Sequence, residues 1–159
     1  MIFVTVGSQK FQFNRLIKKV DQMVRERVIP GEVFMQTGAC DYMPQYCWHQ
    51  PFLDRKHYME MVDKCGVIIT HGGTGTIVDA VKRKKKAIVV PRIVKYGEHV
   101  DDHQLQMLLR FQEMNLIYAC KDVDDLPEAL KTIRTHQFNT YESTTDAFLA
   151  SVDDFIRSV

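Results

Sequence analysis

The sequence lacks a long hydrophobic run, a basic leader and any marked excess of charge. No stretch approaches the about 18 apolar residues that a membrane-spanning helix needs. Met1 leads directly into an apolar segment, so we expect no signal peptide. The formal net charge is +1, which gives no indication of a general affinity for polyanions.

Common cofactor and metal signatures are also missing. The four cysteines have no C-x-x-C spacing, so we expect reduced thiols in a cytoplasmic protein and no zinc site. No G-K-[ST] follows a glycine-rich loop, and Val78 stands where a dinucleotide fingerprint has its third glycine. The length of 159 residues, 45% of them hydrophobic, predicts one globular domain over residues 1–159.

Short apolar runs alternate with segments of helical periodicity along the whole chain. This alternation predicts an α/β fold, a Rossmann-like, doubly wound and mostly parallel sheet covered on both faces. Asp125 and Glu128 have the spacing of a capping box for the fifth helix. The expected strands are Ile2–Val6, Val33–Thr37, a short one near Trp48, Val67–Thr70, Ala87–Val90 and Leu116–Cys120, and the expected helices are Phe13–Arg27, Arg55–Lys64, Gly75–Arg83, Asp101–Met114, Leu126–Arg134 and one from about Thr145.

Two glycine-bearing turns each join an expected strand to an expected helix. They are Val6-Gly7-Ser8-Gln9 and the turn from Thr70 to Thr76. Such a turn presents backbone N–H groups and the positive end of a helix dipole, a combination that suits a phosphate or diphosphate. The alternative is a tight turn that uses glycine for packing alone. Without a dinucleotide fingerprint, the diphosphate of a mononucleotide is the better fit.

Two side chains beside the second turn have both a functional and an ordinary interpretation. His71 follows the strand and is placed to donate to a phosphate or a donor sugar, or it is a partly buried imidazole bound to backbone. Asp79 lies one turn into the helix and is placed to accept hydrogen bonds from ribose hydroxyls, or it complements the helix dipole.

The connection from Gly97 to Gln104 is unusually polar. Its carboxylate and amide side chains suit a polyhydroxylated ligand, whereas for Asp101 alone an ordinary helix cap is the better interpretation. His99 and His103 are four residues apart, but no third metal ligand lies in register.

Two further clusters are best explained without a ligand. The cationic run from Lys82 to Lys86 is expected to be a solvated helix end, with attraction to an anionic membrane surface as the alternative. The aromatic residues Tyr42, Tyr46, Trp48 and Phe52 are expected to pack in the core rather than to stack on nucleic acid.

Several motifs occur in a fixed order along the chain: Val4–Gln9, Gln50-Pro51-Phe52, Thr70–Thr76 with Asp79-Ala80, Val89-Val90-Pro91, and Asp102-His103-Gln104. In this order they resemble the C-terminal, donor-binding domain of MurG-type glycosyltransferases, family 28. The chain is most similar to the stand-alone donor-binding subunits. These are the PssE-type subunits of bacterial capsule and exopolysaccharide biosynthesis and the catalytic subunit of the eukaryotic dolichol-linked N-acetylglucosaminyltransferase.

The resemblance implies one half of a glycosyltransferase-B fold that binds a UDP-sugar. The glycine turns would face the diphosphate, Phe52-Leu53 would present backbone to uracil, and Asp79 would take the place of a ribose-binding glutamate. The donor sugar would be held by His103 and Gln104. The implied substrate-binding residues are Gly7, Ser8, Gln9, Phe52, Leu53, His71, Gly72, Gly73, Thr74, Gly75, Thr76, Asp79, Asp102, His103 and Gln104.

The resemblance also implies an inverting hexosyltransferase whose general base lies on a partner, since no catalytic residue is identifiable in this chain. The UDP-sugar is a substrate, and no cofactor or metal is expected. The expected partner is a membrane-anchored, acceptor-binding subunit that presents a lipid-linked saccharide and holds this cytoplasmic chain at the inner face of the membrane. The last expected helix, from about Thr145, is placed either to dock this partner or to complete the core.

Two other hypotheses stay open. One is a nucleotide-binding regulatory module without chemistry of its own. The other is a metal-dependent hydrolase that uses His99, Asp102 and His103. The sequence does not specify the sugar, the acceptor, the pathway or the oligomeric state.

Overall fold

The computed structural model describes residues 1–99 and 103–141, with the backbone alone described at 103–107. Strands and helices alternate along this part of the chain, as the sequence predicts. In order they are β1 (Ile2–Thr5), α1 (Asn14–Arg25), β2 (Val33–Gln36), β3 (Trp48–Gln50), α2 (Arg55–Lys64), β4 (Val67–Thr70), α3 (Thr74–Lys82), β5 (Lys86–Val89), the 3-10 helix η1 (Val94–Tyr96), α4 (His103–Glu113), β6 (Tyr118–Ala119), the 3-10 helix η2 (Val123–Asp125) and α5 (Leu126–Thr135).

The strands form one parallel sheet in the order β3-β2-β1-β4-β5-β6. This confirms the predicted Rossmann-like, doubly wound fold. The order reverses between β1 and β4, where Thr5 pairs with Thr70 at the carboxyl end of both strands. In open α/β sheets, ligands bind outside the carboxyl ends of the strands at such a switch point.

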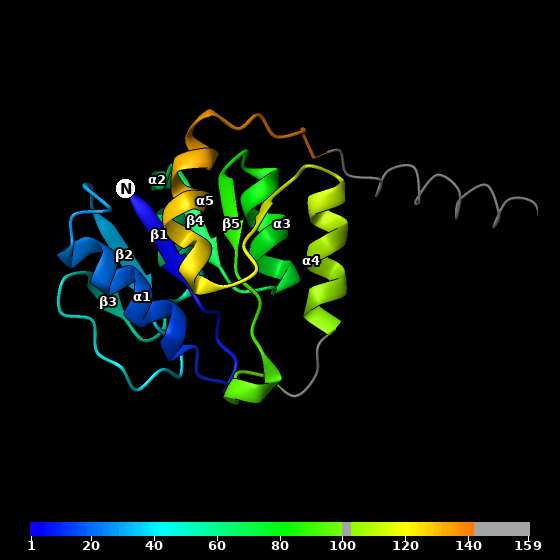
Figure 1. The fold of residues 1–159 in the computed structure, drawn as a ribbon. Helices are drawn as coiled ribbons and strands as arrows, with labels where there is room; N and C mark the ends of the chain where they lie inside the picture. Colours follow the sequence, from blue (N-terminus) through cyan, green and yellow to red (C-terminus); the bar gives the residue numbers. More distant parts are fainter. Residues whose placement is uncertain (100–102, 142–159) are drawn as a thin grey trace, which may run out of the picture.

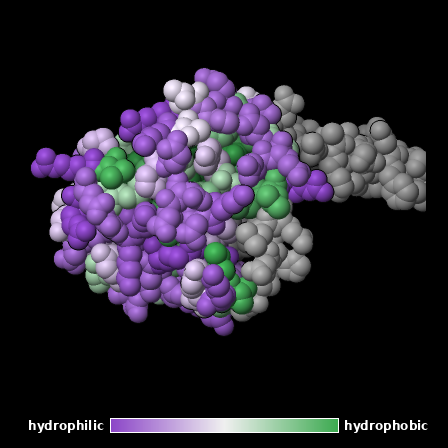
Figure 2. Space-filling view, in the orientation of Figure 1, coloured by the Kyte–Doolittle hydropathy of each residue, from purple (hydrophilic) through white to green (hydrophobic). Residues whose placement is uncertain are grey.

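Helices cover both faces of the sheet (Figure 1). Helices α1 and α5 pack on one face against Val4, Ile69 and Ile88, whereas α2, α3 and α4 pack on the other face against Phe3 and Ile68. Neighbouring strand residues point to opposite faces, which is why Phe3 and Val4 belong to different cores. Figure 2 shows that the described surface over α1 and α5 is mostly hydrophilic, with small separate hydrophobic spots.

Two predictions about local structure were wrong. The capping box belongs to Asp122 and Asp125 at η2, and the Asp125 side chain makes no cap hydrogen bond to α5, because the intervening 3-10 turn shifts the cap toward the N-terminus. Tyr46, Trp48 and Phe52 are not core residues, since their exposed fractions are 55%, 79% and 54%. Trp48 belongs to β3, the edge strand of the sheet, which has a neighbouring strand, β2, on one side only.

The cationic run is also less solvated than the sequence predicts. The Lys85 ammonium donates to the carbonyls of Asp63 and Cys65 at 2.6 and 3.0 Å. The Lys86 ammonium donates to the carbonyls of Ile133 and Arg134 at 2.8 and 2.7 Å. These lysines thus bind carbonyl groups within the fold. The expected helix from about Thr145 lies outside the described residues.

Candidate functional site

A cavity of about 350 Å³ lies at the switch point of the sheet. Its walls come from the carboxyl ends of β1 and β2, the start of α2 and the first turns of α3. Six of the residues predicted to bind substrate line it: Gly7, Ser8, Leu53, Gly75, Thr76 and Asp79. The fold therefore brings residues from three distant segments of the sequence to one cavity.

Apart from His71, which lies between the two glycine turns, the other predicted residues fall into two groups. Five of them belong to the same connecting segments as the lining residues but do not line the cavity: Gln9, Phe52, Gly72, Gly73 and Thr74. Asp102 lies outside the described residues, and His103 and Gln104 are the first two residues of α4, where the backbone alone is described.

Four cavity residues were not predicted from the sequence: Thr5, Gln36, Arg55 and Tyr58. Gln36 ends β2, the neighbour of β1, and Arg55 and Tyr58 lie on the first turn of α2, just after the predicted Phe52-Leu53 segment. The available signal was positional, because each residue lies at or soon after the carboxyl end of a strand that the sequence did predict.

Buried hydrogen bonds link the strand ends beneath the cavity. Thr5 Oγ1 donates to Gln36 Oε1 at 2.7 Å, and Thr70 Oγ1 donates to the Thr5 carbonyl at 2.9 Å. The Gly7 N–H donates to Thr5 Oγ1 at 3.2 Å, so this amide already has a partner within the protein. Gln36 lines the cavity with its Oε1 accepting from Thr5, and its side-chain amide nitrogen is the group that can donate to a ligand.

The His71 imidazole lies between the two glycine turns. A Cβ atom at Gly7 would stand 2.7 Å from His71 Cε1, and one at Gly73 would collide with His71 Nε2. His71 is 5% exposed, and burial together with the Arg92 charge lowers its pKa to about 4. The ring is therefore neutral at physiological pH and supports both turns from beneath.

The N-terminus of α3 opens toward the cavity. Its N-cap, Gly73, has no side chain to bind the first amides of the helix. Gly75 and Thr76 follow in the first turn and line the cavity, and no atom lies within 4 Å of a Cβ atom built at Gly75. Amides at an uncapped helix end, together with the helix dipole, attract an anionic group.

Two loops meet at the same edge of the sheet. The β1–α1 loop contacts the segment between β5 and α4 through a hydrogen bond from Gln12 Nε2 to the Tyr96 carbonyl, at 2.9 Å. The rings of Phe11 and His99 pack with their centroids 5.4 Å apart. The segment that leads into residues 102–104 is therefore fixed to the loop that carries Gly7 and Ser8.

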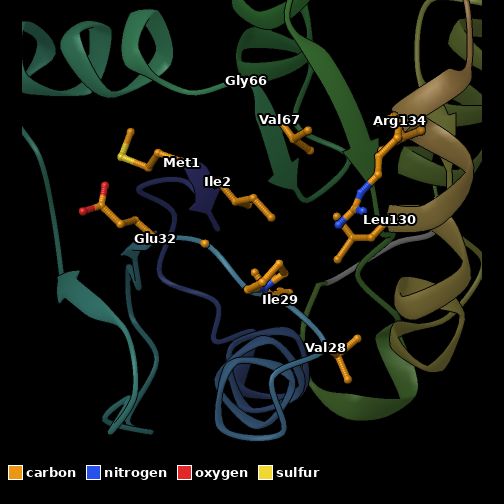
Figure 3. Close-up of a pocket in the computed structure, with 12 residues that line it drawn as sticks. Met1, Ile2, Val28, Ile29, Glu32, Gly66, Val67, Leu130 and Arg134 are labelled. Atoms are coloured by element: carbon orange, nitrogen blue, oxygen red, sulfur yellow. The ribbon is translucent and has the colours of Figure 1, made fainter.

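A second hollow, of about 300 Å³, lies at the opposite edge of the sheet (Figure 3). The starts of β1 and β4, the connection from α1 to β2 and the end of α5 form it, with Ile2, Val67 and Leu130 among its lining residues. It is largely apolar and distant from both glycine turns, so it does not suit a diphosphate.

Among the described residues, no group of three or more histidine, cysteine or carboxylate side chains is arranged to hold a metal ion. Over the same part of the chain, none of the helices combines the length and the hydrophobicity needed to span a bilayer.

Comparisons with known proteins agree with this architecture. The glycosyltransferase family 28 C-terminal domain matches residues 1–159. A protein of Candida glabrata described as UDP-N-acetylglucosamine transferase subunit ALG13 is 30% identical over 97 residues, which cover 60% of this chain and 47% of that protein. The chain thus spans about half the length of that relative.

Solved structures resemble this chain in fold. An NMR structure of ALG13 matches with a TM-score of 0.60 at 18% identity and covers 95% of this chain and 93% of that one. The crystal structure of Acinetobacter baumannii MurG matches with a TM-score of 0.58 at 16% identity, over 83% of this chain and 41% of that one.

Proposed function

Because this chain belongs to the glycosyltransferase family 28 C-terminal domains, we propose that it is the donor-binding subunit of an inverting UDP-sugar glycosyltransferase. The observation that supports the proposal most directly is the cavity at the switch point. It combines an uncapped helix N-terminus at Gly75 and Thr76 with the carboxylate of Asp79. These groups suit the diphosphate and the ribose of one ligand.

In the proposed reaction, an acceptor hydroxyl oxygen attacks the anomeric carbon of the sugar. The bond from that carbon to the diphosphate oxygen breaks, UDP leaves, and the hydroxyl proton passes to a base on the acceptor side. Amides of the α3 N-terminus stabilise the charge that develops on the leaving diphosphate. This role is electrostatic, and the proposal includes no metal or cofactor.

The proposed enzyme needs a second, acceptor-binding subunit. The relative from Candida glabrata is itself described as a transferase subunit, and UDP-N-acetylglucosamine is therefore the first donor to test. We propose a membrane-anchored partner that presents a lipid-linked saccharide, with polysaccharide biosynthesis as the setting and the inner face of the membrane as the place of action.

A thermal-shift panel of nucleotides tests donor binding. A ligand at 100 times its dissociation constant adds about 2.7 kcal/mol to the free energy of unfolding. We expect UDP and UDP-sugars to stabilise the chain more than ADP, GDP or NAD. Stabilisation by ADP or NAD equal to that by UDP would contradict the proposed donor.

The variant Gly75→Asp tests the position of the diphosphate. The side chain at residue 75 has open space around it, and an acidic residue in the first turn of a helix favours folding. The new carboxylate nevertheless repels a bound diphosphate. We expect a folded protein whose melting temperature no longer rises when UDP is added. A rise equal to that of the wild-type chain would show that the diphosphate does not bind at this helix end.

Transfer assays separate the enzyme from the alternative, a nucleotide-binding regulatory module. The chain is mixed with UDP-N-acetylglucosamine and a lipid-linked acceptor, with and without a co-expressed membrane subunit. Transfer that needs both subunits supports the proposal. UDP-sugar binding without transfer in every combination supports the regulatory module.

A further inference from the structure

Arg92 is a buried cation directly behind the β1–α1 loop. It follows Pro91 at the carboxyl end of β5, and 1% of its surface is exposed. Within the described residues, its Nε and Nη1 atoms have no hydrogen-bond partner, and no ion pair reaches it. Burying a charged group in this way is costly unless something compensates the charge.

The contacts that Arg92 does make join the two ends of one loop. Its Nη2 atom donates to the Val6 carbonyl at 2.7 Å and to the Phe11 carbonyl at 3.2 Å. The guanidinium also lies 5.8 Å from the centre of the Phe13 ring, at the end of the same loop. Between these anchors lie Ser8 and Gln9, which are exposed at the carboxyl edge of the sheet.

The carboxylate of Glu98 interacts with Arg92 through space but is bound by another arginine. Burial lowers the pKa of Arg92, and the negative charge of Glu98 offsets part of this effect. Both carboxylate oxygens of Glu98, however, are hydrogen-bonded to Arg15. The positive charge of Arg92 therefore extends into a desolvated region behind the glycine turn, where the effective dielectric constant is low and charge interactions are strong.

We propose that Arg92 is a positioning residue for the diphosphate of the nucleotide. It fixes the β1–α1 loop by its two end carbonyls, so that Gly7 and Ser8 form one wall of the cavity, and it supplies a buried positive charge behind that wall. The inference rests on the proposed function and extends it, because it gives a buried side chain outside the cavity a role in recognising the diphosphate.

The test compares two ligands that differ by the diphosphate. Dissociation constants of UDP are measured by calorimetry and those of uridine by ligand-observed NMR, for the wild-type chain, Arg92→Met and Arg92→Gln. Arg110→Met, which removes an exposed arginine that does not line the cavity, is the matched control. For Arg92→Met we expect UDP to bind about tenfold more weakly or worse, the scale of a charge-assisted hydrogen bond, while uridine binds as before.

The variants give distinct outcomes. Equal UDP affinity in Arg92→Met and wild type overturns the inference, and so does an equal loss for UDP and uridine, which is the result of a general structural defect. If Arg92→Met does not fold, Arg92→Gln, which removes the charge but keeps a hydrogen-bond donor, decides: weaker UDP binding with unchanged uridine binding supports the inference, and wild-type binding of both ligands overturns it. A wild-type chain that binds no UDP overturns the proposed function and this inference with it.

Discussion

The guanidinium of Arg15 binds both carboxylate oxygens of Glu98, with Nε–Oε1 and Nη2–Oε2 distances of 3.0 Å. Glu98 is 1% exposed and also accepts a hydrogen bond from the Ile93 amide at 2.9 Å. Arg15 belongs to α1, whereas Glu98 lies in the segment after β5. This ion pair thus ties the segment that leads into α4 to the first helix of the fold.

We expect Glu98→Gln to destabilise the protein by about 2 kcal/mol or more, because it leaves the half-buried Arg15 charge without its main partner. Urea denaturation measures the change. The control is Glu113→Gln, which breaks an exposed ion pair with Arg110 and is expected to cost less than about 1 kcal/mol. Equal denaturation midpoints for the two variants would contradict a structural role for the Arg15–Glu98 pair.

The buried His71 predicts a specific dependence of stability on pH. Its folded-state pKa is lowered from 6.5 to about 4, so the unfolded chain binds a proton more readily. The associated stability is fully present above pH 6.5 and is lost as the pH falls toward 4, by about 3 kcal/mol in all. We expect His71→Gln to flatten the unfolding free energy in this pH window, and parallel profiles for the two proteins would refute the buried, neutral imidazole.

Gly73 and Gly75 lie two residues apart but differ in the space around them. Gly73→Ala pushes a methyl group into the His71 ring, and we expect it to destabilise the fold by about 1–3 kcal/mol. Gly75→Ala has open space within α3, and we expect it to stabilise the fold by up to about 1 kcal/mol. Thermal denaturation of both variants shows whether each change raises or lowers the stability of the fold. Destabilisation by Gly75→Ala would contradict the described start of α3.

Gly75→Ala also tests ligand approach. If the diphosphate contacts the backbone at residue 75, the added methyl group weakens UDP binding even though the fold becomes more stable. Calorimetry with UDP checks this prediction. Unchanged UDP affinity would indicate that the nucleotide lies farther from the α3 N-terminus.

Asp79 is predicted to bind the ribose. We expect the wild-type chain to prefer UDP over 2′-deoxy-UDP by about tenfold, because a hydrogen bond to a charged group contributes about 1.5–3 kcal/mol. In Asp79→Asn this preference is expected to shrink, with 2′-deoxy-UDP bound as before. Asp124→Asn, at an exposed ion pair with Lys19, is the control. An unchanged preference in Asp79→Asn would place the ribose elsewhere.

Much of the fold could be predicted from local sequence patterns. The β-branched run Val67–Thr70 and the helical spacing in α1 each reflect a regular backbone that short segments specify by themselves. The cap of α5 could not be predicted in the same way. Asp125 and Glu128 have a suitable spacing, but the preceding 3-10 turn engages Asp122 and Asp125 instead.

The sequence by itself determined the alternation of strands and helices and the two glycine turns, because periodicity and glycine content act within a few neighbouring residues. Only the tertiary structure decided that Gln36, Arg55 and Tyr58 line the cavity with Gly7 and Asp79, because the order of strands in the sheet sets which distant segments meet. The tertiary structure also decided that Arg92 is buried. An arginine after a strand is ordinarily solvated, and here the packing of the β1–α1 loop encloses it.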